Sequence, residues 1–190
     1  NIPGLVQITS AVGKYLVVER KLTPETLVKY QIGEYKLKNR DVIGFPYIRD
    51  DQIIRNKSLF LDRPDGKKDM FVTKNSESCL FGWHMVSQDA RTVAIFEGEI
   101  DAMTAYQYGI TRFNSATKAQ EPIGMLSVPF GGGSGNKHEW IEYDFDRLSL
   151  YDEIYICMDS DAEGQLALQE LIKRLGRHRC SVVIFPHKDI

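Results

Sequence analysis

Two aspartates one residue apart are the side chains of this sequence best suited to chemistry. Asp159 and Asp161 follow the apolar run "DEIYICM" (152–158). Along an extended backbone such side chains lie about 6–7 Å apart on the same side. Like charges this close raise each other's proton affinity, and a cation between them relieves the repulsion. The pair therefore predicts a site for Mg²⁺ or Mn²⁺, hard divalent cations that prefer oxygen ligands.

A second group of acids follows the apolar run 92–96. Glu97 comes directly after the run, Gly98 permits a tight turn, and Glu99 and Asp101 fall at the start of a helix-like stretch. Taken alone, Glu99 and Asp101 are explained equally well by the helix dipole, which favours acids at a helix N-terminus. Together with the paired aspartates, the acids after this run favour a metal-dependent site.

Four apolar runs in the second half predict the strands that position these acids. The runs are "TVAIF" (92–96), "MLSV" (125–128), "DEIYICM" (152–158) and "SVVIF" (181–185). Helix-like stretches separate them, and this alternation predicts a mainly parallel sheet with helices on both faces. Functional groups of such sheets gather at the carboxyl ends of the strands, so Glu97, Asp159 and Asp189 should meet at one edge.

The first half has a different pattern. Residues 22–33 predict a helix with Thr23 as N-cap, and the apolar stretches around Asp50 and Asp51 predict a hairpin. We therefore expect a smaller α+β subdomain, residues 1–90, followed by an α/β domain, residues 91–190. The polar stretch "SQDAR" (87–91) marks the expected boundary.

Composition limits the partners and the setting. The 190 residues carry a net charge of −2, so a nucleic acid would have to be held by a local patch or through metal ions. The three cysteines and four histidines have neither zinc-site nor disulfide spacing, which favours a reducing, cytoplasmic setting. No apolar run reaches membrane-spanning length, so no membrane partner is expected. The start without Met and the end soon after an apolar run are typical of a piece of a larger protein.

Two further stretches have simpler explanations than a binding motif. "PFGGGSGNK" (129–137) lacks the spacing of a P-loop and favours a flexible loop that opens into a helix, with Asn136 and Lys137 as candidate contacts to template or nucleotide. "TRFNSATKAQEPIG" (111–124), which carries Arg112 and Lys118, is expected to be a surface insertion, with a template-facing role as the alternative.

The acidic motifs also carry a family resemblance. "FEGEIDAMTAYQYGI", "ICMDSDAEG" and "FPHKD" resemble the Toprim catalytic core of phage-type primases and primase–helicases, a group that includes DnaG-like and Twinkle-like proteins. Upstream, "LTPETLVKYQIG", "VIGFPYI", "NKSLFLD" and "CLFGWH" resemble the subdomain that precedes this core. The resemblance covers Leu22 to Asp189. It implies an α/β Toprim fold whose mainly parallel four-stranded sheet is flanked by helices and preceded by a smaller α+β subdomain.

The resemblance implies roles for the acids. Glu97 matches the family's glutamate, a general acid/base or metal-positioning group, and Asp101 matches the acid of the same motif. Asp159 and Asp161 match the metal-binding pair, and Asp189 matches the aspartate that follows the fourth strand.

The resemblance also implies a grip on phosphates. Lys57 matches a basic residue of the upstream subdomain that faces substrate phosphates. The family usually has an arginine shortly after this lysine, but here apolar residues occupy that stretch. Arg63, Lys67 and Lys68 are the candidates to supply that charge instead.

The function implied by the resemblance is that of a nucleotidyltransferase, a DNA-directed RNA primase. Such a core joins ribonucleoside triphosphates into short RNA primers on a single-stranded DNA template, beside a replicative helicase that is fused or separate. The setting would be the cytoplasm of a bacterial cell or a phage-infected host.

Two alternatives stay open from the sequence. The same carboxylates would serve a Toprim nuclease or topoisomerase, although none of the nine tyrosines has the context of a topoisomerase nucleophile. A non-catalytic DNA-binding scaffold beside a helicase is the other alternative, and the retention of all five acids weighs against it.

Overall fold

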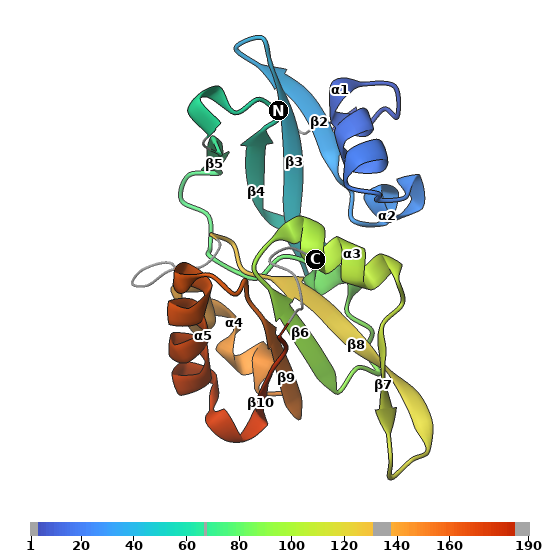
Figure 1. Ribbon diagram of the computed structural model, residues 1–190, viewed down its shortest axis with the longest axis vertical. Coiled ribbons are helices and arrows are strands. Elements are labelled where there is room, and N and C mark those ends of the chain that lie inside the picture. Colours follow the sequence, from blue (N-terminus) through green and yellow to red (C-terminus); the bar gives the residue numbers. More distant parts are fainter. Residues whose placement is uncertain (1–3, 67, 131–137, 185–190) are drawn as a thin grey trace. The chain divides into compact units, whose positions relative to one another are not determined.

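The computed structural model describes residues 4–66, 68–130 and 138–184 of the chain (Figure 1). The chain divides into two compact units, Asn1–Ser76 and Glu77–Ile190. The division comes earlier than the boundary expected at 90/91. The reason is that Leu80 and Trp83 are buried in the core of the second unit, and Phe81 exchanges two backbone hydrogen bonds with Ser127.

The first unit is an antiparallel sheet with short helices, an α+β arrangement. Its strands are β1 (Gly4–Leu5), β2 (Gly33–Leu37), β3 (Arg40–Arg49), β4 (Gln52–Phe60) and β5 (Met70–Val72), in the order β1-β2-β3-β4-β5. Its helices are α1 (Ala11–Gly13), a wider π-type helix Lys14–Glu19 that continues it, and α2 (Pro24–Lys29).

Local sequence explains two features of this unit. Thr23 caps α2 as expected, because its hydroxyl accepts the N–H of Thr26 at 3.2 Å and Pro24 occupies the first turn. The hairpin expected at Asp50 and Asp51 joins β3 to β4, and both aspartates have positive φ (52° and 60°). Positive φ at both positions is the geometry of the tight hairpin turn that matches the strands' twist.

The second unit contains the parallel sheet that the apolar runs predicted. Its strands are β6 (Thr92–Phe96), β7 (Thr111–Asn114), β8 (Ala119–Ser127), β9 (Glu153–Cys157) and β10 (Cys180–Val182), in the order β10-β9-β6-β8-β7. The four strands β10, β9, β6 and β8 are parallel, and β7 is antiparallel to β8. The stretch 111–124, expected as a surface insertion, is therefore a β-hairpin that extends the sheet.

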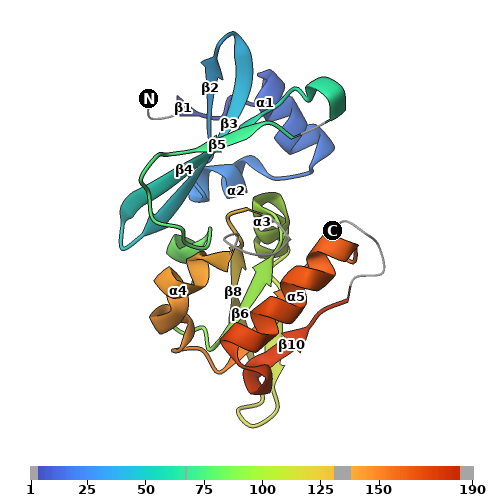
Figure 2. The same cartoon turned by 90° about the vertical axis from the view of Figure 1, so that its left-hand side faces the viewer.

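Helices cover both faces of this sheet. They are α3 (Glu99–Gln107), α4 (Trp140–Leu148) and α5 (Ala162–Leu175). Val93 and Ile95 of β6 belong to a core with side chains of α4 and α5, whereas Ala94 and Phe96 pack with those of α3. Figure 2 shows α4 and α5 beside the strands of this sheet. Successive residues of a strand point to opposite faces, so a sheet buried on both faces needs an unbroken apolar run. None of the helices in the described ranges has the length and apolar character to cross a membrane.

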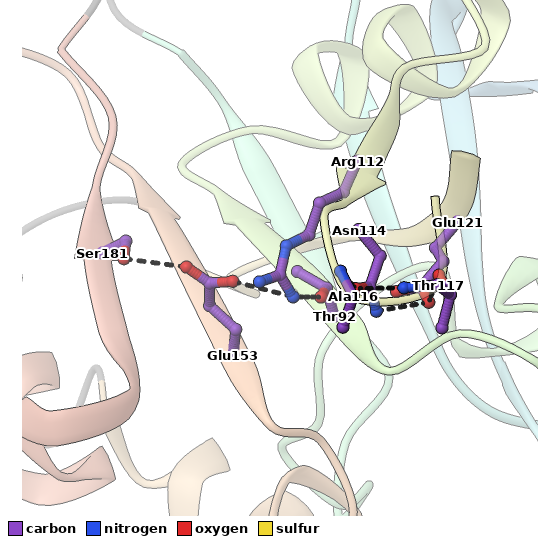
Figure 3. Close-up of polar contacts among 8 residues, drawn as sticks. All are labelled: Thr92, Arg112, Asn114, Ala116, Thr117, Glu121, Glu153 and Ser181. Carbon is purple, nitrogen blue, oxygen red and sulfur yellow. Dashed lines mark hydrogen bonds and ion pairs between the residues drawn. The ribbon is translucent and has the colours of Figure 1, made fainter. Parts of the chain in front are cut away.

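An ion pair ties the hairpin to the rest of the sheet (Figure 3). The Arg112 guanidinium on β7 lies 3.0 Å from Glu153 Oε2 on β9 and 3.3 Å from Thr92 Oγ1 on β6. Glu153 Oε1 in turn accepts the hydroxyl of Ser181 on β10 at 3.1 Å. The side chain of Arg112 thus serves an internal network that reaches four strands.

A buried carboxylate holds the segment before β6 against α4. Asp144 of α4 is fully buried, and its Oδ2 accepts the backbone N–H of Leu80 at 2.6 Å. Loss of such an acceptor would leave the Leu80 N–H buried without this partner, which costs stability. Asp144 therefore fixes the path of the residues that sequence analysis assigned to the first subdomain.

Replacing Asp144 with Ala should lower the free energy of unfolding by about 1–3 kcal/mol, since it leaves the Leu80 N–H buried without this acceptor. Urea unfolding followed by circular dichroism measures the change. Asp146→Ala is the matched control, because Asp146 lies on the same helix and is exposed. Equal unfolding free energies for the two variants would contradict a stabilising role for Asp144.

Candidate active site

The carboxyl ends of three parallel strands lie level with one another. Phe96 of β6 is paired in register with Ser127 of β8 and with Cys157 of β9. Side chains that follow these residues therefore emerge at one edge of the sheet, as the sequence predicted. The edge is the usual place for functional groups in open parallel sheets.

Glu97 and Asp159 meet at this edge. Glu97 Oε2 accepts the backbone N–H of Asp159 at 3.2 Å, although the two residues are 62 positions apart in the sequence. Both side chains are partly exposed, so solvent and a substrate have access to them. The structure thus brings together one acid from each of the two motifs singled out in the sequence.

Asp161 begins the helix that follows β9. It is the N-cap of α5, with extended backbone angles (φ −78°, ψ 175°), and its Oδ1 accepts the N–H of Gly164 at 3.0 Å. The capping role considered for this residue is thus present. Its carboxylate is partly exposed, so the cap leaves it at the same strand end as Asp159.

Asp101 lies in the first turn of α3 and its side chain turns back toward the start of the helix. A Cβ built on Gly98 would lie 2.6 Å from Asp101 Oδ2, which shows how closely the carboxylate approaches the Gly98 backbone. Gly98 directly follows Glu97, so the Asp101 carboxylate lies beside the turn that carries Glu97. The neighbouring Glu99 is buried, with 7% of its surface exposed.

The candidate basic residues belong to the first unit. Lys57 lies on β4, paired with Phe45 of β3 and Val72 of β5, and only 7% of its surface is exposed. Arg63 and Lys68 are exposed in the segment between β4 and β5. Four other candidates lie outside the described residues: Lys67, Asn136, Lys137 and Asp189.

The acidic side chains at this edge supply carboxylate oxygens, the kind of ligand that hard divalent cations prefer. Within residues 4–66, 68–130 and 138–184, no three His, Cys, Asp or Glu side chains are grouped so that they could hold a metal ion. Glu97, Asp159 and Asp161 nevertheless offer only carboxylate oxygens at adjoining strand ends. Mg²⁺ needs one or two such carboxylates, and completes its shell with water and substrate phosphates.

The thiol nearest this edge is not a nucleophile. Cys157 ends β9, and burial raises the pKa of its thiol to about 12, so it stays protonated at neutral pH. It lines an apolar cavity of about 310 Å³ between α3 and the sheet, together with Ala94, Met125 and Tyr155. The chemistry available at the edge is therefore that of carboxylates.

Sequence reasoning did not single out Gly164 as part of this site. Its signal is a glycine three residues after Asp161, inside the first turn of a helix, where glycine is unfavourable. The backbone of Gly164 both donates to Asp161 and lies against Asp159.

Comparison with known proteins gives a family model and two relatives from one plant. A family model described as Toprim-like matches residues 94–190. A primase homolog protein of Arabidopsis thaliana is 25% identical over 174 residues, which cover 90% of this chain and 49% of that protein. The chloroplastic/mitochondrial Twinkle homolog protein of the same plant is 24% identical over 171 residues, 90% of this chain and 23% of that protein. The chain thus spans half or less of the length of these relatives.

Solved structures share the fold. The primase fragment of the bacteriophage T7 primase-helicase protein matches with a TM-score of 0.70 and 21% identity, over 90% of this chain and 65% of that one. The zinc-binding and RNA polymerase domains of the Aquifex aeolicus primase match with a TM-score of 0.64 and 13% identity, over 94% of this chain and 51% of that one. Both matches include the antiparallel unit as well as the parallel sheet, since each covers nine-tenths of the chain or more.

Proposed function

The chain belongs to the Toprim-like family, and we propose that it is the catalytic core of a DNA primase that makes short RNA primers on single-stranded DNA with the help of a divalent metal. The observation that carries the proposal is the hydrogen bond between Glu97 Oε2 and the Asp159 N–H, which joins the two acidic motifs at one sheet edge. The likeness of both units to primase structures supports a primase over other Toprim enzymes.

The proposed reaction is attack of a primer 3′-hydroxyl on the α-phosphate of an incoming ribonucleoside triphosphate, with pyrophosphate as leaving group. Bound Mg²⁺ or Mn²⁺ would supply positive charge to the triphosphate and polarise the attacking hydroxyl. Asp159 and Asp161 would hold the metal, with Asp101 and Asp189 as further acids of the site. Glu97 would accept the proton of the hydroxyl or orient the metal's ligands, since its carboxylate is held at the same edge.

Local cations are proposed to hold the nucleotide and the template. The net charge of −2 gives no general attraction for polyanions, so specific side chains must do so. The proposed cations are Lys57, Arg63, Lys67, Lys68 and Lys137, and the neutral amide of Asn136 is a further proposed contact. A complex of the T7 primase domains with an RNA/DNA hybrid has the same fold (TM-score 0.70, 22% identity, over 91% of this chain and 80% of that one), which supports a template partner here.

A replicative helicase, fused or separate, is the other proposed partner, since relatives of this chain include primase-helicase proteins. Copying of DNA would place the protein in the cytoplasm of a bacterial or phage-infected cell.

Asp159→Asn should reduce primer synthesis by about 100-fold or more, because it removes a proposed metal ligand at the reacting centre. The assay mixes single-stranded DNA templates, four ribonucleotides (one of them labelled) and Mn²⁺, and separates the products by length. Asp152→Asn is the matched control, since Asp152 is exposed just before the opposite end of β9. Both variants should unfold at the wild-type temperature in EDTA.

Other outcomes would select the alternatives. Metal-dependent cleavage of the DNA, abolished in Asp159→Asn, would assign the carboxylates to a nuclease. Absence of both products would leave a DNA-binding scaffold. Equal synthesis by Asp159→Asn and wild type would contradict the proposed site.

Lys57→Met should raise the KM for ribonucleotides about tenfold or more, since a charge-assisted contact to phosphate contributes roughly 1.5–3 kcal/mol. Steady-state primer synthesis at varied nucleotide concentration measures the change. Lys36→Met is the matched control, because Lys36 lies on the neighbouring part of the same sheet with 69% of its side chain exposed. An unchanged KM in Lys57→Met would remove this residue from the nucleotide grip.

A further inference from the structure

The backbone of Asp159 lies against Gly164 more closely than any side chain at that position would permit. A Cβ built on Gly164 would lie 2.1 Å from the Asp159 carbonyl oxygen and 2.9 Å from its carbonyl carbon. Real Cβ atoms essentially never approach another heavy atom within 3.0 Å. The obstacle is backbone, so no side-chain rotation can relieve the contact. Any residue other than glycine would therefore displace Asp159 or the start of α5 by about 0.9 Å, the difference between the 3.0 Å limit and the 2.1 Å distance to the Asp159 carbonyl oxygen.

The backbone N–H of Asp159 is held by the motif that contains Glu97. The Asp159 N–H donates to Glu97 Oε2 at 3.2 Å, and its carbonyl lies against the Gly164 Cα. The two contacts lie on either side of the Asp159 Cα. Together they fix the direction in which the Asp159 carboxylate leaves the backbone.

The glycine is not needed for its conformational freedom. Gly164 lies within α5, and its φ is not among the positive values found at other glycines of the described chain. Its N–H donates to Asp161 Oδ1, a bond that the N–H of alanine would form equally well. Alanine would even favour the helix. What glycine supplies here is the absence of a Cβ.

We propose that Gly164 is a positioning residue of the metal site, which acts through the backbone of Asp159. The inference rests on the proposed metal-dependent function. A shift of about 1 Å in a group that orients reactants can cost about 100-fold in rate, so the close contact has a direct consequence for catalysis. The sequence pattern D-x-D-x-x-G then has three linked parts: the acid that is positioned, the acid that caps α5, and the glycine that admits the positioned backbone.

The test is Mn²⁺ binding by Gly164→Ala, measured from the electron paramagnetic resonance signal of free Mn²⁺. Gly164→Ala should bind Mn²⁺ at least about tenfold more weakly than wild type, because the added Cβ displaces the proposed ligand Asp159. Excess Mn²⁺ should restore part of its primer synthesis. Circular dichroism in EDTA should show a folded protein.

Two controls separate positioning from helix stability. Gln165→Gly weakens α5 at the neighbouring exposed position and should lower the unfolding temperature without changing Mn²⁺ affinity. Gly4→Ala repeats the substitution where a Cβ would meet nothing within 4 Å, and should change neither quantity.

Each remaining result has one meaning. Wild-type Mn²⁺ affinity in Gly164→Ala would overturn the inference while leaving the proposed function intact. So would a Gly164→Ala protein that fails to fold in EDTA, or loss of Mn²⁺ affinity in Gln165→Gly to the same extent, because either assigns the glycine to helix stability. Absence of Mn²⁺ binding in the wild type itself, with no difference from Asp159→Asn, would remove the proposed metal-dependent function and the inference with it.

Discussion

The hydrogen bond from the Asp159 N–H to the Glu97 carboxylate is the contact on which the site depends. It joins residues that follow two neighbouring parallel strands, and it exists only because Phe96 and Cys157 end level with each other. That register in turn depends on apolar side chains packed on both faces of the sheet. The hydrophobic core thus determines where the carboxylates stand, and local turns determine how they point.

The sequence predicted the parallel strands because strands buried on both faces must be apolar throughout. It did not predict β7, which lies at the edge of the sheet. Thr111 and Phe113 of that strand are exposed, and Arg112 is half-buried and forms an ion pair with Glu153. Leu80 and Trp83 lie in a segment without helical or strand periodicity, so their packing into the core of the second unit could not be predicted from the sequence.

The candidate site divides in the same way. Strand ends can be predicted from a sequence, so the meeting of Glu97 and Asp159 followed from the positions of two apolar runs. The capping of α5 by Asp161 could be predicted too, because N-cap positions have a known residue preference. The close approach of Gly164 to Asp159 could not be predicted. A glycine in a helix gives no indication of which atoms occupy the space that a Cβ would fill.

The β7–β8 hairpin has separate contacts at its base and at its turn. The ion pair of Arg112 with Glu153 anchors the hairpin at its base, on the sheet, whereas the turn after Asn114 is held by its own contacts to Ala116 and Glu121 (Figure 3). We therefore expect insertions or deletions in the turn to leave the strand register undisturbed. We expect homologous chains to differ in hairpin length while the acidic edge of the sheet stays in place.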